Sequence, residues 1–504
     1  MRKDQKSSKD TMTNNDASEK PRLIIASNRL PLSITENDGK YEATASSGGL
    51  VSALRGIGAA SYLWLGWPGM EIKEEDRDPV NTALAKENAA AIYLDDQLAQ
   101  NHYNGFSNAI LWPILHYQSG VIMNPKAWEA YQIVNEIFAD RISEEATEGD
   151  LIWVHDYHLL LLPSLLRSRL QAKKKKCPIG FFLHTPFPVD DFWRGLPVQE
   201  DLLRGILGSD IIGFHTDEYM KNFEGACEIL LGTGTGTAEH HISHEDRTIK
   251  LGRYAVGIDH TRFTDALDDP AIQSRIQELG ALYKGKAVII GVDRMDYTKG
   301  LPEKLRGFQA FLDEHSEWSE KIVLIQIAVP SREEVKEYKE LEEEVSKLAG
   351  QIIGKHATPH STPLLYIHRS VSFAELVALY SISDACLLAS RRDGMNLVAS
   401  EYAACQQDRH GVLVLSEFTG AASFLKHGSV LFNPASASGV SNAIHQALTM
   451  GREERKAKYE ELRDFITFHT RCVSYRVFII SKTLIVYSIK WIETFLEDMR
   501  TFQG

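Results

Sequence analysis

The sequence predicts an α/β fold made of two doubly wound, Rossmann-like domains. Short apolar runs that are typical of buried strands alternate with helical segments, and this alternation indicates parallel sheets with right-handed crossovers. The alternation pauses around Gly257-Ile258-Asp259 and resumes at residues 287–292. We therefore expect two domains that face each other across a cleft, with ligands bound at the carboxyl ends of the strands.

Four apolar runs in the first half of the chain are expected to form buried strands. Each run is short and continuous, and polar residues follow it. The runs cover residues 23–27, 151–154, 179–183 and 211–215. Helices are expected at residues 50–57, 80–100, 126–141 and 159–171. Asn37-Asp38-Gly39-Lys40 between the first strand and the first helix favours a hairpin turn.

The second half repeats the same organisation. Its expected strands cover residues 287–292, 321–328, 385–389 and 412–415. We place the first domain at residues 21–259 and the second at residues 260–470. Residues 1–20 are polar and lack apolar periodicity, which predicts a disordered tail.

The composition excludes several classes of protein. A net charge of −13 over 504 residues argues against a nucleic-acid binder and against an anionic membrane partner. Any phosphate site must therefore be a local cluster of cations. The five cysteines lack metal-type spacing, which suits a reducing compartment. No signal peptide is evident, and no apolar run approaches the ~20 residues that span a bilayer. These features predict a cytoplasmic protein.

Charged side chains gather at the ends of the predicted strands. The residues in these positions are Arg29, Asp156, His184, Arg294, Arg332 and Asp393. A single arginine at a strand end is usually structural, but several on two facing sheets predict an anion-binding cleft.

The stretch from Ser390 to Glu401 combines a strand end, a glycine turn and a helix start. The first N–H groups of a helix have no internal partner, so such a turn can bind an anion. We expect Gly394 to form the tight turn, and Asp393 and Glu401 to accept hydrogen bonds from sugar hydroxyls. An ordinary strand–turn–helix unit is the alternative.

Several motifs together carry a family resemblance. They are residues 26–31 (ASNRLP), 47–50 (SGGL), 103–108 (YNGFSN), 153–157 (WVHDY), 184–188 (HTPFP), 291–300 (GVDRMDYTKG), 331–332 (SR) and 392–398 (RDGMNLV). With them, the chain from about residue 21 to 470 resembles the trehalose-6-phosphate synthases. These are retaining glycosyltransferases of the two-domain GT-B type, and the fungal catalytic subunits look most similar.

The resemblance implies transfer of glucose from UDP-glucose to glucose 6-phosphate, giving trehalose 6-phosphate and UDP. It also implies a C-terminal helix that returns to the N-terminal domain. The family is thought to react by a front-face route in which the departing phosphate takes the acceptor proton, without a carboxylate nucleophile. No cofactor and no metal ligand are expected, because Arg294 and Lys299 on one loop can neutralise a departing diphosphate.

The resemblance assigns three groups of site residues. Catalytic roles go to Asp156, His184, Arg294 and Lys299. Acceptor contacts go to Arg29, Trp67, Tyr103, Trp112, Asp156 and Arg332. Donor contacts go to Gly48, Gly49, His184, Arg294, Lys299, Val371, Asp393, Gly394, Met395, Asn396, Leu397, Val398 and Glu401.

Residue types alone leave alternatives open. Trp67 and Trp112 are also typical core residues, and His184 is also typical of a hydrogen-bonded core histidine. At the level of function, the alternatives are a non-catalytic, sugar-phosphate-sensing subunit and a related glycosyltransferase with another phosphorylated acceptor.

Two regions depart from the family pattern. Residues 354–366 match less well, which weakens the assignment of Val371. Residues 471–489 have no acidic side chain and are rich in β-branched and aromatic types where the family has a helix. We expect this segment to be foreign to the fold, with a surface hairpin as the alternative, and the last helix to occupy residues 490–504. No phosphatase-like domain follows, so dephosphorylation to trehalose would need another protein. The partners expected are a second copy of the chain or a phosphatase subunit.

Overall fold

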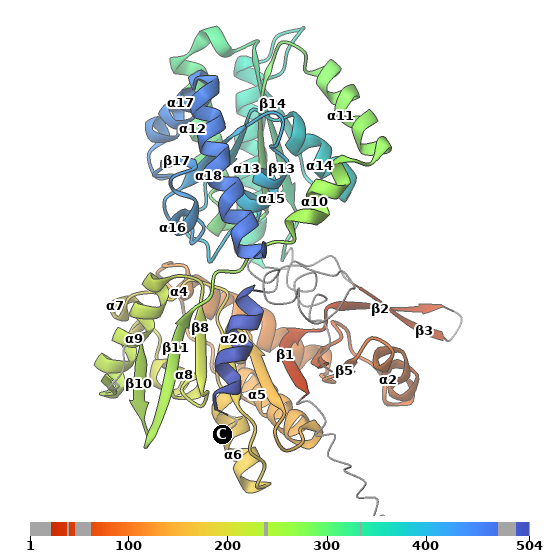
Figure 1. Ribbon diagram of the computed structural model, residues 1–504, viewed down its shortest axis with the longest axis vertical. Helices are drawn as coiled ribbons and strands as arrows, with labels where there is room; N and C mark the ends of the chain where they lie inside the picture. Colours follow the sequence, from red (N-terminus) through yellow and green to blue (C-terminus); the bar gives the residue numbers. More distant parts are fainter. Residues whose placement is uncertain are drawn as a thin grey trace, which may run out of the picture.

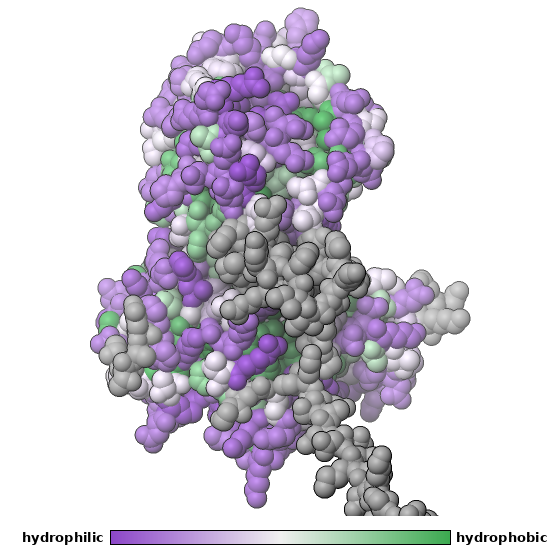
Figure 2. Space-filling view, in the orientation of Figure 1, coloured by the Kyte–Doolittle hydropathy of each residue, from purple (hydrophilic) through white to green (hydrophobic). Residues whose placement is uncertain are grey.

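The computed structural model describes residues 22–37, 40–45, 62–235, 240–332, 335–471 and 490–502. These residues form two domains that lie one above the other (Figure 1). The face seen in Figure 2 is mainly hydrophilic over both domains. No helix in the described part of the chain is long and apolar enough to cross a membrane.

The N-terminal domain is built on a nine-stranded sheet that is parallel except at one edge. In spatial order its strands are β5 (Ala89–Ala91), β4 (Tyr62–Trp67), β1 (Leu23–Arg29), β6 (Leu151–His155), β7 (Ile179–Phe182), β8 (Ile211–Phe214), β11 (Arg247–Arg253), β10 (His241–His244) and β9 (Gly234–Thr235). A separate antiparallel hairpin joins β2 (Leu32–Asn37) and β3 (Lys40–Ala45), as the turn signal predicted.

The C-terminal domain has a six-stranded, fully parallel sheet. Its strands, in spatial order, are β14 (Leu364–Ile367), β13 (Ile322–Val329), β12 (Ala287–Arg294), β15 (Ala385–Leu388), β16 (Val412–Ser416) and β17 (Ser429–Phe432). The two parallel sheets confirm the predicted fold class.

Helices cover both sheets. In the N-terminal domain they are α2 (Arg77–Ala85), α3 (Asp96–Gln100), α4 (Trp112–Leu115), α5 (Pro125–Glu145), α6 (Leu162–Ala172), α7 (Asp190–Trp193), α8 (Gln199–Ile206) and α9 (Asp217–Leu231). In the C-terminal domain they are α10 (His260–Leu267), α11 (Pro270–Leu282), α12 (Leu301–Glu314), α13 (Lys336–His356), α14 (Phe373–Ile382), α15 (Val398–Ala404), α16 (Ala422–Leu425), α17 (Ala437–Thr449) and α18 (Arg452–Arg471). Short 3₁₀ turns are η1 (Glu74–Asp76), η3 (Tyr157–Leu159), η4 (Tyr297–Lys299) and η5 (Ser316–Trp318), and α3 continues into a π-helix, η2 (Asn101–Leu111).

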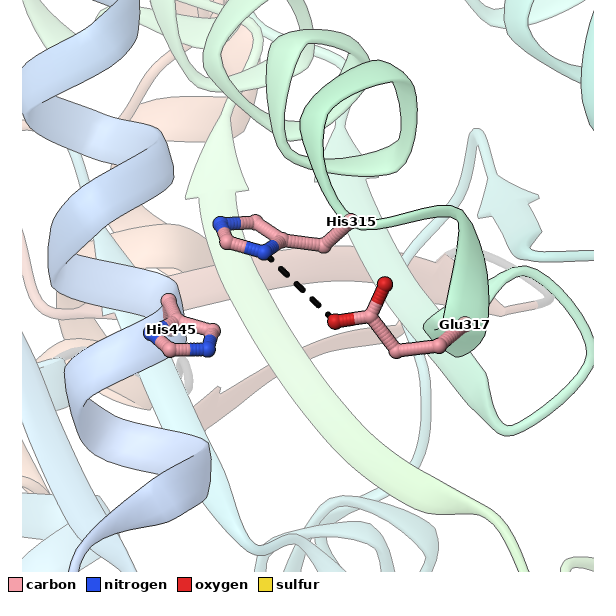
Figure 3. A group of neighbouring side chains, drawn as sticks. All are labelled: His315, Glu317 and His445. Carbon is pink, nitrogen blue, oxygen red and sulfur yellow. Dashed lines mark ion pairs between the residues drawn. The ribbon is translucent and has the colours of Figure 1, made fainter.

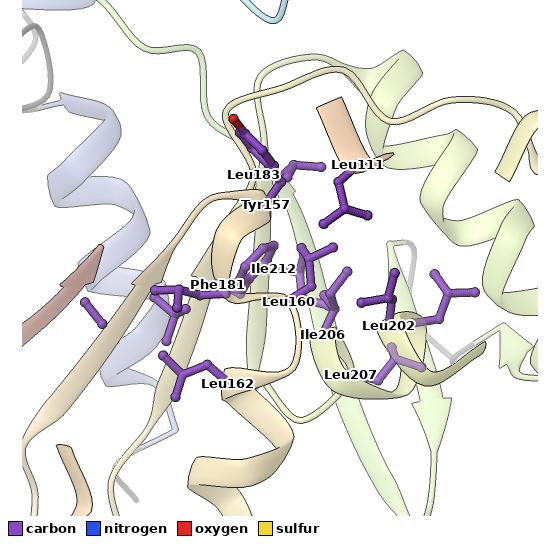
Figure 4. Packing of buried hydrophobic residues seen from close by; sticks show 14 of the residues in the cluster. Leu111, Tyr157, Leu160, Leu162, Phe181, Leu183, Leu202, Ile206, Leu207 and Ile212 are labelled. Atoms are coloured by element: carbon purple, nitrogen blue, oxygen red, sulfur yellow. The ribbon is translucent and has the colours of Figure 1, made fainter. Parts of the chain in front are cut away.

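Buried apolar strands hold each sheet between helices. All five residues of β6 are buried, and Figure 4 shows Phe181 of β7 and Ile212 of β8 in one buried cluster with Leu202 and Ile206 of α8. Burial of this kind stabilises the fold by roughly 25 cal/mol for each Å² of apolar surface removed from water. The polar residues that follow such strands emerge at one edge of the sheet.

The predicted helix over residues 80–100 is only partly correct. Helix α2 ends at Ala85, and Ala89–Ala91 form the edge strand β5, which pairs in parallel with β4. Alanine has a high helix propensity, so the local sequence favours a helix. Two of the three alanines are buried against the domain core, and this tertiary contact decides the structure.

The last helix, α20 (Lys490–Arg500), packs on the N-terminal domain, as the resemblance implied. Its residues Ile492, Phe495 and Met499 are fully buried there. The Phe495 ring stacks on Trp153 of β6 at 4.8 Å between centroids. A Cβ at Gly180 would lie 2.6 Å from the Phe495 ring, so this glycine makes room for the helix.

Several predictions concern residues outside the described ranges. They are the polar tail at residues 1–20, the helix over 50–57, the donor contacts of Gly48 and Gly49, and nearly all of the anomalous segment 471–489.

Candidate active site

The carboxyl ends of strands from both sheets line a cavity of about 630 Å³ between the domains. Strands β1 and β12 are mostly buried along their length but end in an exposed residue, Arg29 and Arg294 respectively. Of the predicted site residues, the lining includes Arg29, Tyr103, Trp112, Asp156, His184, Arg294, Lys299, Arg332, Asp393, Gly394, Met395, Asn396 and Leu397.

Four predicted residues lie outside this lining. Trp67 lies behind Arg29, whose guanidinium carbon is 5.3 Å from the centre of the Trp67 ring. Val371 and Val398 pack against the core of the C-terminal domain. Glu401 accepts a hydrogen bond of 3.2 Å from the Tyr380 hydroxyl, and burial raises the pKa of its carboxyl group. Their proposed ligand contacts remain predictions.

Arg332 is held by groups from both domains. Its Nη2 donates to the Tyr157 hydroxyl at 3.2 Å, and its Nη1 donates to the Tyr338 hydroxyl. Its guanidinium carbon lies 4.4 Å from the centre of the Trp112 ring. Burial disfavours the charge, but nearby Tyr157, Tyr338 and Asp296 raise the pKa of Arg332. Arg332 is therefore a fixed, permanent cation in the cavity wall.

Asp296 lies beneath this arginine and is completely buried. Its Oδ2 is 3.4 Å from Arg294 Nη2 and 3.8 Å from Arg332 Nη1. Its Oδ1 accepts hydrogen bonds from the amide and the hydroxyl of Thr298. Although burial opposes ionisation, Arg294, Arg332 and Lys299 hold the pKa of Asp296 below its usual value. The ionised carboxylate thus aligns two arginines and the loop that carries Lys299.

Lys299 and Asp393 meet at the opposite wall of the cavity, where Lys299 Nζ lies 2.6 Å from Asp393 Oδ2. The same oxygen accepts from Asn396 Nδ2 at 3.1 Å. Burial opposes the charge on Asp393, but Lys299 holds the pKa of this carboxyl below its usual value. Only the other carboxylate oxygen of Asp393, Oδ1, is therefore left for the predicted hydrogen bonds from sugar hydroxyls.

Gly394 differs from its expected role as a turn residue. The backbone φ of Gly394 is not positive, whereas that of Asn396 is +56°. A Cβ on Gly394 would lie 2.0 Å from the carbonyl oxygen of His184 in the other domain. The glycine therefore permits close approach of the two domains, and the turn itself uses Asn396.

Three histidines that follow neighbouring strands form one wall of the cavity. They are His155, His184 and His215. His155 Nδ1 lies 3.1 Å from His184 Nε2, and the rings of His184 and His215 are 5.5 Å apart. Burial lowers the pKa of all three imidazoles, to about 3 for His155 and about 4 for His215. They are uncharged at neutral pH and act through hydrogen bonds.

Asp156 occupies a strained backbone position at the end of β6, with φ +73°. Such a conformation is costly for a residue with a side chain and is common at functional sites. Its Oδ1 accepts a hydrogen bond of 3.2 Å from the backbone amide of His184. Burial raises the pKa of Asp156 to about 6. Hydrogen bonds to its carboxylate and the charges of Arg332 and Arg294 oppose this rise but do not cancel it.

We expect Asp156→Asn to raise the stability of the ligand-free protein at pH 7.5. A folded-state pKa above the usual 3.8 of an aspartate means that ionisation destabilises the fold. As the pH rises from about 4 to about 6, the wild type therefore loses stability relative to Asp156→Asn. Because Asp156 is only half-buried, we expect about 1–2 kcal/mol, or a melting point raised by ~2–6 °C. Thermal unfolding at several pH values checks this, and a less stable variant at neutral pH would contradict it.

Sequence reasoning missed several lining residues. His155, Tyr157 and His215 directly adjoin strand ends, so the rule used for Asp156 and His184 could have found them. Asp296 belongs to the GVDRMDYTKG motif, but no pattern in the sequence indicates that it is buried beneath two arginines.

The cavity carries a local positive charge within an acidic protein. Its lining includes four cations, Arg29, Arg294, Lys299 and Arg332, against two carboxylates, Asp156 and Asp393. The Trp112 ring lies close to two of these cations, 4.4 Å from Arg332 and 5.6 Å from Arg294. The arrangement can hold two phosphorylated groups side by side, with aromatic rings for an apolar sugar face.

Comparisons with known proteins identify the family of the chain. The model of glycosyltransferase family 20 matches residues 21–473. A relative from Aspergillus niger, alpha,alpha-trehalose-phosphate synthase [UDP-forming] 2, is 48% identical over 454 residues, covering 89% of this chain and 94% of the relative. The Saccharomyces cerevisiae relative, the 56 kDa subunit of alpha,alpha-trehalose-phosphate synthase [UDP-forming], is 44% identical over 454 residues, covering 89% and 91%.

Solved structures share the fold over nearly their whole length. The N-terminal domain of trehalose-6-phosphate phosphatase from Candida albicans has a TM-score of 0.83 at 30% identity and covers 96% of this chain and 97% of its own. The Escherichia coli protein bound with UDP-2-fluoro glucose has a TM-score of 0.82 at 32% identity, covering 95% and 99%. A Burkholderia xenovorans synthase in complex with glucose-6-phosphate has a TM-score of 0.81 at 27% identity, covering 95% and 100%.

The family match spans almost all of the chain that carries the two domains, and the residues that line the cavity fall within it. The chain therefore belongs to glycosyltransferase family 20.

Proposed function

We propose that this protein is a UDP-forming alpha,alpha-trehalose-phosphate synthase. It transfers glucose from UDP-glucose to glucose 6-phosphate with retention and releases trehalose 6-phosphate and UDP. The observation that carries this proposal is one cavity that gathers four cations, Arg29, Arg294, Lys299 and Arg332. Similar proteins bear this activity in their names, and two similar structures hold UDP-2-fluoro glucose and glucose-6-phosphate.

The C-terminal wall is the proposed donor side. Arg294 ends β12, Lys299 lies in η4 just after it, and residues 394–397 also line the cavity. As the bond to glucose breaks, negative charge grows on the UDP phosphates, and fixed cations stabilise this charge in the transition state. A diphosphate near Lys299 would replace part of its contact with Asp393.

The proposed acceptor side lies around Arg332 and Asp156. Arg332 has a buried Nε without a hydrogen-bond partner among the described residues, and a phosphate oxygen could accept from it. Trp112 offers an aromatic face for the C–H groups of the sugar. Asp156, ionised above a pH of about 6, would orient an acceptor hydroxyl.

We propose that no covalent glycosyl-enzyme intermediate forms. A retaining enzyme that uses one needs a free carboxylate nucleophile beside the anomeric carbon. Of the two carboxylates in the lining, Asp393 pairs with Lys299 and Asn396 through one oxygen, and Asp156 lies near Arg332 on the proposed acceptor side. In the front-face route, the acceptor oxygen bonds to the anomeric carbon as the bond to UDP breaks. The acceptor proton then passes to the departing phosphate.

A non-catalytic role has one specific observation in its favour. The similar Candida albicans structure is the N-terminal domain of a phosphatase, so this fold also occurs joined to another activity. The paired cations and the aligned Asp296 favour a working transferase here, and turnover distinguishes the two functions.

We expect UDP release from UDP-glucose that requires glucose 6-phosphate and continues in EDTA. The four cations of the cavity can neutralise the leaving diphosphate without a metal ion. A coupled UDP assay over a panel of sugar phosphates measures this, with trehalose 6-phosphate identified as the product. No turnover with any acceptor would support the regulatory alternative, and complete loss of activity in EDTA would refute metal independence.

We further propose a cytoplasmic location and assembly with a phosphatase that consumes the product. The four described cysteines are free and buried, as suits a reducing compartment. The Saccharomyces cerevisiae relative is called a subunit, which supports assembly into a complex or a homo-oligomer.

A further inference from the structure

Three potential metal ligands converge on the surface of the C-terminal domain, outside the cavity lining. They are His315, Glu317 and His445, and Figure 3 shows their side chains close together. One ligand atom from each lies within 4.8 Å of the other two. His315 Nδ1 is 3.6 Å from Glu317 Oε1. Among the described residues, this group alone combines three such ligands.

Three separate elements bring these residues together. His315 directly follows α12, Glu317 lies in η5, and His445 lies on α17. Ser441, one helical turn before His445 on the same face of α17, donates to Glu314 at the end of α12. The two helices are therefore fixed to each other next to the histidines, and their imidazole rings stack at 4.2 Å and 8°.

We propose that His315, Glu317 and His445 bind one divalent transition-metal ion, with Zn²⁺ as the best match. Two imidazole nitrogens and one carboxylate oxygen are ligands that Zn²⁺ prefers, whereas Mg²⁺ and Ca²⁺ prefer oxygen alone. The glutamate side chain is 60% exposed, so water can complete the coordination shell.

Formation of the site requires the His315 ring to turn out of its stack on His445, because two nearly parallel imidazoles cannot both direct a nitrogen lone pair at one ion. Zn–N and Zn–O bonds of about 2.0–2.2 Å place tetrahedral ligand atoms roughly 3.3–3.5 Å apart. The present separations reach 4.8 Å, and rotation of the partly exposed His315 and the exposed Glu317 can close this difference. A nearby pair, His356 and Asp313, lacks a third ligand, and Asp313 also pairs with Lys355.

The proposed ion would act on stability and leave sugar transfer unchanged. It would join the last turn of α12 to α17. The opposite end of α12 follows the loop that carries Lys299, and 14 helical residues, roughly 21 Å, separate the two ends. An ion that binds only the folded state raises its stability.

The test is Zn²⁺ titration of the metal-free full-length protein by calorimetry, together with thermal unfolding. Wild type should bind one more equivalent of Zn²⁺ than His445→Ala, and Glu317→Gln should weaken this site at least tenfold. Saturating Zn²⁺ should raise the wild-type melting point by about 2–4 °C, and an equal concentration of Mg²⁺ should not. Turnover should be the same with and without bound Zn²⁺.

His427→Ala is the matched control, because His427 is exposed on the same domain and belongs to no such group. It should bind Zn²⁺ as wild type does. Unfolding curves without metal establish that each variant is folded. Equal Zn²⁺ binding by wild type, His445→Ala and Glu317→Gln would overturn the proposal, and so would an equal response to Mg²⁺.

Discussion

Replacing Arg332 by alanine is expected to raise the KM for glucose 6-phosphate by about 10- to 100-fold, with little change in the KM for UDP-glucose. A charge-assisted hydrogen bond is worth about 1.5–3 kcal/mol, which corresponds to this range. Arg332 lies against Trp112 and donates to Tyr157, on the proposed acceptor side of the cavity. Initial rates with each substrate varied separately provide the measurement.

Arg332→Lys is the informative companion variant. It keeps the positive charge but loses the planar group that bonds to Tyr157 and Tyr338 at the same time. Its KM for the acceptor should lie between those of wild type and Arg332→Ala. Because removal of Arg332 also leaves Asp296 with one cation fewer, melting curves must show that both variants are folded. An equal rise in the KM of donor and acceptor would contradict the assignment.

Arg294→Ala should instead lower kcat, by about 10²- to 10³-fold, the loss typical when one fixed stabiliser of transition-state charge is removed. The Arg294 side chain is 44% exposed, and its charged partner is Asp296, which retains Arg332. The fold should therefore tolerate the change. If charge grows on UDP only in the transition state, kcat and kcat/KM fall together while the KM values change little.

Arg306→Ala is a suitable control for Arg294→Ala. Arg306 is a similarly exposed arginine of the same domain, and it pairs with Glu344 outside the cavity lining. It should retain wild-type kcat. If Arg294→Ala raises only the KM for glucose 6-phosphate, then Arg294 belongs to the acceptor site and the division of the cavity is wrong.

The strands that the sequence predicted share one property. Runs such as residues 287–292 and 385–389 are apolar throughout because helices cover both faces of the sheet, and this pattern is visible without structural information. Strand β5 was missed because its alanines carry no strand preference. β14 was missed for a different reason: it lies at the edge of the sheet, and only Leu364 of its four residues is buried.

The site was predictable where it depends on strand ends and less so where it depends on contacts between domains. The position of Arg332 after β13 marked it as a candidate, but its bond to Tyr157 joins residues 175 positions apart. Tyr338, on α13, completes the same contact and follows no strand. The bond between Arg332 and Tyr157 arises only when the two domains meet, so no local pattern records it.

The position of α20 has a consequence for how the protein folds as it is made. Strand β11 ends at Arg253, but the core of the N-terminal domain remains open until Ile492, Phe495 and Met499 have left the ribosome. At about 5–20 residues per second, the ribosome needs roughly 10–50 s to synthesise the intervening chain. During that interval the part of the sheet around Trp153 lacks the helix that covers it, which leaves an apolar surface on the nascent chain for a chaperone to cover.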